Sequence, residues 1–358
     1  MEVNLTHSRY YYVVVGSYGA NDEQAIEILK FDSEEGSLMK IGSTTGIENP
    51  SFLTINRANN RLYSVSEVEQ GEVVSYGLDL GSGQLVEMNR QKTQGSHPCY
   101  ISLETNDGCL FAVNYGGGSI NIFPLQEDGS IAPLSDVKYY TGSSIVEKHQ
   151  EQSHPHAIVN IPNTNKFIVT DLGTDLLYVY ELQLQTCKFQ LVEEVTIPAG
   201  SGPRHLVVHP ERHNIYVVHE LNSSLSVFAY DEGGESLQLI QTIGTLTEEF
   251  DGSNYCADIH ISPTGTHLYV SNRGHHSIAT FEILNDGQLK LIGNTSTMGE
   301  WPRNFAIVPN GKFLLVANQH SNSIEVMKIP DDYVPTEMDR RYSVNQPVCL
   351  LVIPELLK

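Results

Sequence analysis

The sequence lacks the features that would place it in several large classes of protein. No stretch approaches the 18 or so consecutive apolar residues of a membrane-spanning helix. The opening residues MEVNLTHSRYYYVVVG lack the long apolar segment and cleavage site of a secretory signal. The five cysteines (Cys99, Cys109, Cys187, Cys256 and Cys349) are odd in number and lack CxxC spacing. We therefore expect reduced thiols and a cytoplasmic location.

Positive charge is also scarce. There are 21 Lys and Arg against 43 Asp and Glu, a formal net charge of −22. Nucleic acids and anionic membranes are bound through Lys and Arg, so neither is an expected partner. Charges at a surface are screened beyond about 8 Å, so a local arginine cluster could still bind a small anion. The GxSxG, GxGxxG, GxxxxGK, HExxH and paired CxxC motifs are missing as well, which removes the common hydrolase, nucleotide and zinc signatures.

What the sequence does contain is a repeat that returns about every 45 to 57 residues. Each copy has a proline, an apolar run, a turn and a second apolar run that ends in polar residues. Six copies are complete: NPSFLTINRANNRLYSVSE, HPCYISLETNDGCLFAVNY, HPHAIVNIPNTNKFIVTDL, GPRHLVVHPERHNIYVVHE, YCADIHISPTGTHLYVSNR and WPRNFAIVPNGKFLLVANQ. The prolines are Pro50, Pro98, Pro155, Pro203 and Pro302, and Cys256 stands in the fifth copy. Short strands repeated at this period predict an all-β propeller.

The two chain ends supply the halves of a seventh copy. QPVCLLVIPE resembles the first strand of the repeat, and YYYVVVGSYG resembles the second. We therefore predict a single domain over residues 1–358, a seven-bladed propeller whose ring is closed by a blade shared between the N- and C-termini. Three long segments, 139–153, 245–255 and 330–345, precede opening strands and are expected on one face of the disc.

Polar residues recur at two positions of the repeat that should meet at one rim of the central channel. The position after the proline carries Ser51, Cys99, His156, Arg204, Ala257, Arg303 and Val348. The end of the second strand carries Ser17/Tyr18, Ser66/Glu67, Asn114/Tyr115, Asp171/Leu172, His219/Glu220, Asn272/Arg273 and Asn318/Gln319. Polar groups that converge in a cleft predict a binding site. Several of them, Asn114, Asp171, Asn272 and Asn318 above all, could instead hydrogen-bond neighbouring backbone.

Arginines beside a histidine and a glutamate suit a carbonyl compound that carries negative charge. One arginine would bind a carboxylate or phosphate, and another would stabilise the oxyanion formed when water adds to the carbonyl. His156 is the expected general base, with a pKa near neutrality, and arginines should keep Glu220 ionised. His154 could carry the proton instead of His156. At the same rim His154, Arg303, Gln319 and Glu67 are expected substrate contacts.

The segments QEQSHPHAIV, GSGPRHLVVHP, CADIHISPTGTHLYVSNRGHHSIATFEI and WPRNFAIVPNGKFLLVANQHSNSIEV resemble the propeller lactonase family over essentially the whole chain. The resemblance implies a metal-independent enzyme without a cofactor, whose site consists of His156, Arg204, Glu220 and Arg273. It also implies that Gln150, in a polar stretch before the histidine, contributes to the pocket. The family's best-known activity implies that the bound partner is a sugar lactone. The implied reaction is hydrolysis of 6-phosphogluconolactone to 6-phosphogluconate in the oxidative pentose phosphate pathway.

Three alternatives remain open at this point. A muconate-type lactonising cycloisomerase of the same family would use the same residue types. A non-catalytic protein-interaction propeller would expose apolar or aromatic side chains at the rim, whereas this rim is charged. A calcium- or zinc-dependent lactonase would use oxygen ligands such as Glu67, Asn114, Asn272 and Asp171.

Overall fold

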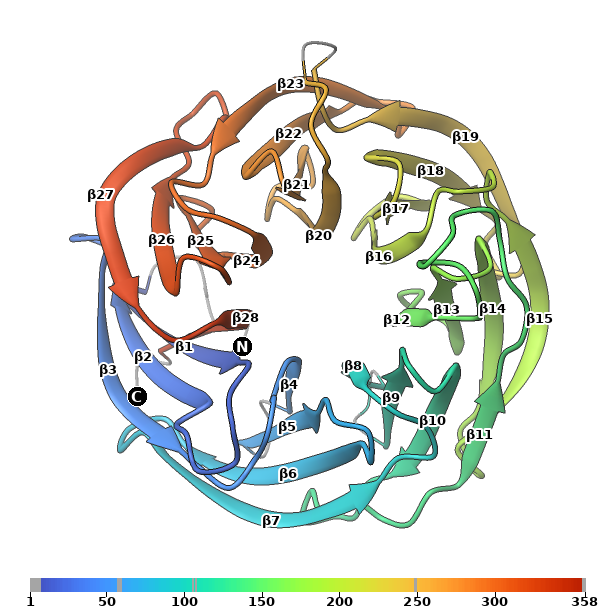
Figure 1. Ribbon diagram of the computed structural model, residues 1–358, viewed down its shortest axis with the longest axis horizontal. Coiled ribbons are helices and arrows are strands. Elements are labelled where there is room, and N and C mark those ends of the chain that lie inside the picture. Colours follow the sequence, from blue (N-terminus) through green and yellow to red (C-terminus); the bar gives the residue numbers. More distant parts are fainter. Residues whose placement is uncertain (1–7, 57–59, 105, 107, 248–249, 356–358) are drawn as a thin grey trace.

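The computed structural model describes residues 8–56, 60–104, 106, 108–247 and 250–355. All regular elements in these ranges are β-strands, and they form seven four-stranded antiparallel sheets arranged as the blades of a ring (Figure 1). The predicted seven-bladed β-propeller is confirmed. No helix within these ranges has the length and apolar character to cross a bilayer.

The four strands of each blade follow one another from the central channel to the outer wall. Blade 1 has β28 (Pro347–Pro354), β1 (Tyr10–Ser17), β2 (Ile26–Asp32) and β3 (Ser37–Thr44). Blade 2 has β4 (Leu53–Asn56), β5 (Arg61–Ser66), β6 (Glu72–Asp79) and β7 (Gln84–Lys92). Blade 3 has β8 (Pro98–Leu103), β9 (Cys109–Asn114), β10 (Ser119–Pro124) and β11 (Asp136–Tyr139). Blade 4 has β12 (Pro155–Asn160), β13 (Lys166–Asp171), β14 (Leu176–Gln183) and β15 (Lys188–Thr196).

The remaining three blades follow in chain order. Blade 5 has β16 (Pro203–Val208), β17 (Asn214–His219), β18 (Ser224–Tyr230) and β19 (Leu237–Gly244). Blade 6 has β20 (Tyr255–Ile261), β21 (His267–Arg273), β22 (Ser277–Ile283) and β23 (Leu289–Ser296). Blade 7 has β24 (Pro302–Ile307), β25 (Phe313–Asn318), β26 (Ser323–Lys328) and β27 (Thr336–Ser343). The inner strands surround the central channel, and the fourth strands form the outer wall (Figure 1).

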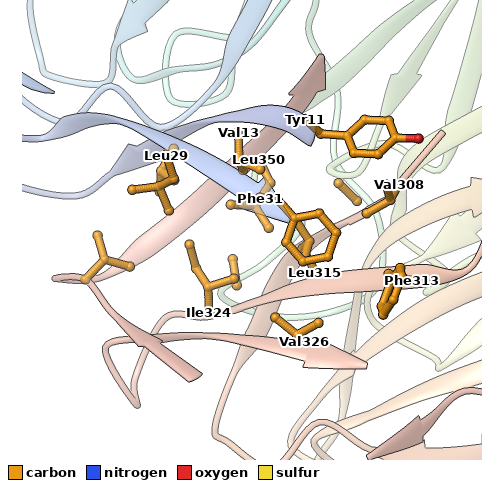
Figure 2. Close-up of a cluster of buried hydrophobic side chains, with 14 residues drawn as sticks. Tyr11, Val13, Leu29, Phe31, Val308, Phe313, Leu315, Ile324, Val326 and Leu350 are labelled. Carbon is orange, nitrogen blue, oxygen red and sulfur yellow. The ribbon is translucent and has the colours of Figure 1, made fainter. Parts of the chain in front are cut away.

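The ring is closed by strands from both ends of the chain. The C-terminal strand β28 pairs antiparallel with β1, from Pro347 beside Ser17 to Pro354 beside Tyr11. Figure 2 shows the apolar cluster that packs this blade against blade 7, including an edge-to-face contact between Phe31 and Phe313 with ring centroids 5.4 Å apart. Burial of such side chains stabilises each by about 1.5–3 kcal/mol, so the closing blade is held by packing as well as by strand pairing.

Of the long loops expected from the sequence, one is present and one is not. Residues 140–154 form a loop without strands between β11 and β12. In this loop Ser144 Oγ donates to Asp175 at 2.6 Å, and the ring of His149 lies 5.9 Å from that of Tyr255 in blade 6. The prediction that 330–345 is a long loop is wrong, because half of this segment forms β27. That strand is largely exposed and polar on both faces, so it lacks the alternation by which a sequence reveals a strand. Of 245–255, residues 248 and 249 lie outside the described residues.

The expectation that all five cysteines are reduced thiols is also wrong. Cys109, at the start of β9, forms a disulfide with Cys187, in the turn before β15 of the next blade. The two residues are 78 positions apart in the sequence, and adjacent packing of blades 3 and 4 brings them together. Cys99, Cys256 and Cys349 are free and buried. The cytoplasmic location stays a prediction, and the cysteines no longer support it.

Candidate active site

The strand register brings the two sets of polar positions to one rim, as predicted. The proline at the start of an inner strand pairs with the last residue of the second strand: Pro98 with Asn114, Pro155 with Asp171, Pro203 with His219, Pro302 with Asn318, and Pro347 with Ser17. In all five blades the register shifts directly after this proline, and in four of them the bulged residues are Cys99, His156, Arg204 and Arg303. A bulge turns a side chain away from the regular alternation of a strand, and here it occurs at the candidate site residues.

Glu220 joins the two arginines at the centre of the site. Its Oε2 lies 2.9 Å from Arg204 Nε and 2.8 Å from Arg273 Nη2, so one carboxylate links blades 5 and 6. The N–H of Arg204 Nε is not aimed at the carboxylate, so this contact is an ion pair rather than a hydrogen bond. Both arginine side chains are almost fully buried, at 3% and 4% exposed, and Glu220 is 15% exposed. The cluster therefore holds two positive charges against one negative charge at the mouth of the channel.

Backbone carbonyls fix the orientation of both guanidinium groups. Arg204 Nη1 donates to the carbonyl of Ala257 at 2.6 Å, and Arg273 donates to the carbonyls of Tyr255 at 3.2 Å and Cys256 at 3.0 Å. Burial and the charge of Arg273 lower the pKa of Arg204 to about 10, against the opposing effect of Glu220, so it stays protonated at neutral pH. Burial alone would raise the pKa of Glu220, but Arg273, Arg204 and Arg303 outweigh it and lower the pKa. The expectation of an ionised Glu220 is confirmed.

His156 is buried beside this cluster, at 4% exposed. Its ring lies 5.1 Å from that of His205 and 5.6 Å from that of Tyr115, and its Nδ1 is 3.8 Å from Cys99 Sγ. Burial, followed by the charges of Arg204 and Arg303, lowers the pKa of His156 well below its ordinary value. The expectation of a pKa near neutrality is therefore wrong for the free protein, in which His156 is a neutral imidazole and can accept a proton.

Arg303 is the arginine of the mouth that has no carboxylate partner in the part of the chain that the structure describes. Its guanidinium lies 5.4 Å from the ring centroid of Tyr18, whose hydroxyl donates to Glu67 at 3.0 Å. Among the described residues no hydrogen bond or ion pair is formed by the Arg303 side chain. Burial opposes its charge, but Tyr18, Glu67 and Glu220 together raise its pKa. This cation can therefore bind an anionic group.

A small cavity connects the two halves of the cluster. Arg204 and Arg303 line it together with Ser51, Cys99 and His205. The hydroxyl of Ser51 is buried there and has no hydrogen-bond partner in the described part of the chain. A buried hydroxyl costs free energy unless it is hydrogen-bonded, and the cavity, at about 10 Å³, has room for about one water molecule.

A second buried network supports the first and is not evident from the sequence. Asp258 Oδ1 accepts from His205 Nδ1 at 2.8 Å, and its Oδ2 accepts from His260 Nε2 at 2.9 Å and from Asn304 Nδ2 at 2.5 Å. The other ring nitrogen of His205 accepts from Arg204 Nη1 at 3.2 Å. Burial and Arg204 lower the pKa of His205 to about 4, in keeping with that acceptor role. The sequence does contain these residues beside the predicted site, His205 in GPRH and Asp258 and His260 in ADIH. Only the strand pairing in the structure shows that they contact one another.

The other predicted contacts have more local partners. His154 stacks on Tyr115, with ring centroids 4.2 Å apart, and its Nδ1 lies 2.8 Å from the Tyr115 carbonyl. Gln150 is fully buried, and its amide accepts from Val146 N–H and donates to the Leu172 carbonyl. Gln319 has a buried Oε1 without a partner among the described residues, and no hydrogen bond or ion pair in these ranges connects its side chain to the arginines. Substrate contacts by these three residues stay predictions.

Several polar residues at the ends of second strands have structural partners. Asp171 accepts from Ser153 Oγ at 2.6 Å and from the backbone of His154 at 2.7 Å, while Asn272 accepts from Thr245 at 2.9 Å. Asn318 donates to the carbonyl of Thr297 at 2.9 Å. In the described ranges no group of three or more His, Cys, Asp and Glu side chains has the arrangement of a metal site. Asp171 and Asn272, two of the oxygen ligands proposed for a metal-dependent lactonase, therefore have structural partners.

Comparison with known proteins gives a consistent result. Residues 12–352 match the sequence profile of the family described as Lactonase, 7-bladed beta-propeller. The chain is similar to 6-phosphogluconolactonase of Bacillus subtilis, with 31% identity over 94% of this chain and 96% of that protein. It is also similar to 6-phosphogluconolactonase of Formosa agariphila, with 34% identity over 85% and 88% of the two chains.

A solved structure agrees with these sequence relatives. The periplasmic gluconolactonase of Pseudomonas aeruginosa superposes with a TM-score of 0.91 at 30% identity, covering 97% of this chain and all of that one (100%). The match therefore covers nearly the whole ring. The chain is therefore an enzyme of the carboxylic-ester hydrolase class and belongs to the lactonase family of seven-bladed β-propellers.

Proposed function

We propose that this protein hydrolyses a sugar lactone, most specifically 6-phosphogluconolactone to 6-phosphogluconate, the reaction of the oxidative pentose phosphate pathway. The observation that carries the proposal is the mouth itself, where Arg204 and Arg273 share Glu220 and Arg303 stays without a carboxylate partner. A lactone with a distal phosphate presents one carbonyl and one dianion. The two parts of the arginine cluster match these two groups.

The arginines would stabilise the charge that develops on the lactone carbonyl. As water adds to the carbonyl carbon, its oxygen becomes an oxyanion, and a well-placed donor at that point is worth about 3–4 kcal/mol. Arg204 and Arg273 are suited to this role because their guanidinium groups are buried and held by backbone carbonyls before substrate arrives. The negative charge of Glu220 would hold the two positive guanidinium groups close to each other, and Glu220 itself would take no part in bond making or breaking.

His156 would move the proton. Its neutral imidazole takes a proton from the attacking water, the bond from the carbonyl carbon to the ring oxygen breaks, and the same proton passes to that oxygen to give the hydroxyl. The low pKa of His156 in the free protein comes from burial and then from Arg204 and Arg303. A bound phosphate would offset both cations, so the substrate itself would raise the pKa of His156 toward the range of an effective base.

The test is the opening of freshly generated 6-phosphogluconolactone, coupled to 6-phosphogluconate dehydrogenase and corrected for spontaneous hydrolysis. We expect acceleration that survives a chelator and falls by about 10²–10³-fold in Arg204→Gln. Arg340→Gln is the matched control, because Arg340 lies on the exposed outer strand β27. An unaccelerated reaction with a folded protein would reject this substrate, and loss of muconate absorbance on the same sample would indicate the cycloisomerase.

A further inference from the structure

The residue before the inner-strand proline has an unusual backbone conformation in five blades. Its φ is positive at Asn49 (48°), His97 (52°), Gly202 (65°), Trp301 (65°) and Gln346 (37°). Gly and Asn adopt this left-handed region with little strain, whereas a bulky aromatic residue rarely occupies it. Blade 7 therefore has the chain's single tryptophan at a position where the other four of these blades have Asn, His, Gly or Gln.

Neighbouring strands hold Trp301 in this conformation. Its N–H donates to His276 Nδ1 at 3.1 Å, and its carbonyl accepts from the N–H of Gln319 at 3.0 Å. His276 follows β21 of blade 6, and Gln319 follows β25 of blade 7. The backbone of Trp301 is thus held from both sides at the junction of two blades.

The indole reaches the catalytic cluster. Arg273 Cζ lies 5.4 Å from the ring centroid, the imidazole of His320 stacks at 4.8 Å with an interplanar angle of 13°, and the ring of Tyr255 is 6.1 Å away. Glu220 and two backbone carbonyls already hold the edge of the Arg273 guanidinium. The guanidinium also lies over the indole ring, so a cation–π contact adds to these hydrogen bonds and to the ion pair.

We propose that Trp301 is a positioning residue that holds the Arg273 guanidinium by a cation–π contact, so that Arg273 faces both Glu220 and the substrate. The effect on catalysis rests on the proposed function, whereas the contact between the two side chains does not. A cation–π contact in a partly desolvated site corresponds to about 2- to 30-fold in an equilibrium or rate. Loss of the ring should change kcat/KM by a factor in this range.

The chain offers a matched control for the strained backbone. Tyr333 also has a positive φ, 62°, and it stacks on His267 at 3.9 Å and 12°. His267 begins β21 and Arg273 ends it, so Tyr333 lies at the opposite end of that strand from the site. Tyr333→Asn therefore removes an aromatic ring and a left-handed bulky residue without touching the arginines.

The kinetic test compares Trp301→Asn, Trp301→Phe and Tyr333→Asn with the unaltered protein. We expect Trp301→Asn to lower kcat/KM by about 5- to 30-fold with the fold intact, and Trp301→Phe, which keeps a ring, to recover activity to within about 3-fold. In an Arg273→Gln background, Trp301→Asn should add less than about 2-fold. The proposal is overturned if Trp301→Asn is as active as the unaltered protein, if Tyr333→Asn loses as much, or if the loss is undiminished in that background.

A spectroscopic test needs no substrate, because Trp301 alone provides the tryptophan emission. Iodide is attracted by a nearby cation and acrylamide is not. Arg273→Gln should therefore shift the emission and lower iodide quenching by about 2-fold or more while acrylamide quenching stays the same. An unchanged emission and iodide response would show that the contact is missing in solution. If this shift occurs but the lactone is not hydrolysed, the contact stands and the proposed substrate fails.

Discussion

Glu220 and Arg273 form an ion pair of 2.8 Å across the boundary between blades 5 and 6. The carboxylate also lies 2.9 Å from Arg204, so its removal would leave two buried arginines facing each other without an anion. Burial without compensation is expensive for a charged group. The pair is therefore expected to matter for stability and for activity together.

Glu220→Gln should lower kcat/KM by about 10²-fold or more, because the two arginines lose their fixed separation. It should also lower the free energy of unfolding by about 1–3 kcal/mol. Steady-state kinetics and urea unfolding measure the two effects. Glu325→Gln is the control, since Glu325 is a buried carboxylate paired with Arg341 in blade 7, away from the mouth. It should lose stability but not activity, and equal loss of activity in both variants would contradict the assigned role.

Arg303→Gln should separate recognition of phosphate from lactone chemistry. With 6-phosphogluconolactone we expect kcat/KM to fall by about 10- to 100-fold, because a charge-assisted bidentate contact is lost. With unphosphorylated gluconolactone the change should stay within about 3-fold. The measurement is the ratio of kcat/KM for the two lactones. A uniform loss with both would place Arg303 at the carbonyl instead of the phosphate.

The pH dependence of kcat/KM should report the pKa of His156 in the free protein, and that of kcat its pKa in the substrate complex. Activity requires the neutral imidazole, so it is lost as pH falls through the pKa of His156. That pKa is lowered in the free protein, so the acid limb of kcat/KM should lie below pH 6.5. Bound phosphate offsets Arg204 and Arg303, so the acid limb of kcat should lie at higher pH than that of kcat/KM. Coincident limbs, or limbs that persist in His156→Gln, would refute this assignment.

Reduction of the disulfide should destabilise the ring. The bond between Cys109 and Cys187 closes a loop with a sequence separation of 78, and such bonds typically contribute about 2–4 kcal/mol. Urea unfolding with and without dithiothreitol measures the difference. Thiol labelling in denaturant should count three thiols before reduction and five after. Five thiols without reductant would show that the bond is not formed.

Much of the site followed from the repeat alone. Once the proline of each copy is placed at the start of an inner strand, antiparallel pairing puts His156, Arg204 and Arg273 at one rim, and the structure bears out that register. The ion pairs of Glu220 followed from the same alignment. This part was predictable because a period-two strand leaves little freedom in which positions meet.

Other features depend on contacts that a linear pattern does not encode. The pairing of Cys109 with Cys187 depends on how neighbouring blades pack, and the hydrogen bonds of Asp258 depend on a bulge in β20. The low pKa of His156 follows from its depth, whereas the sequence showed only the arginines nearby. The sequence does not indicate a role for Trp301, because a residue before a proline is ordinarily interpreted only for its restricted backbone conformation.

The order of strands has a consequence in time. Blades 2 to 7 are each built from consecutive segments, so each can pair as the chain leaves the ribosome. Blade 1 has to wait, because β1 is made first and its inner partner β28 is made last. The backbone of Leu350 on β28 donates to Asn304, which in turn donates to Asp258 behind Arg204. The catalytic mouth would therefore be complete only when β28 pairs with β1, so that activity appears in one step after blades 2 to 7 have formed rather than gradually with each blade.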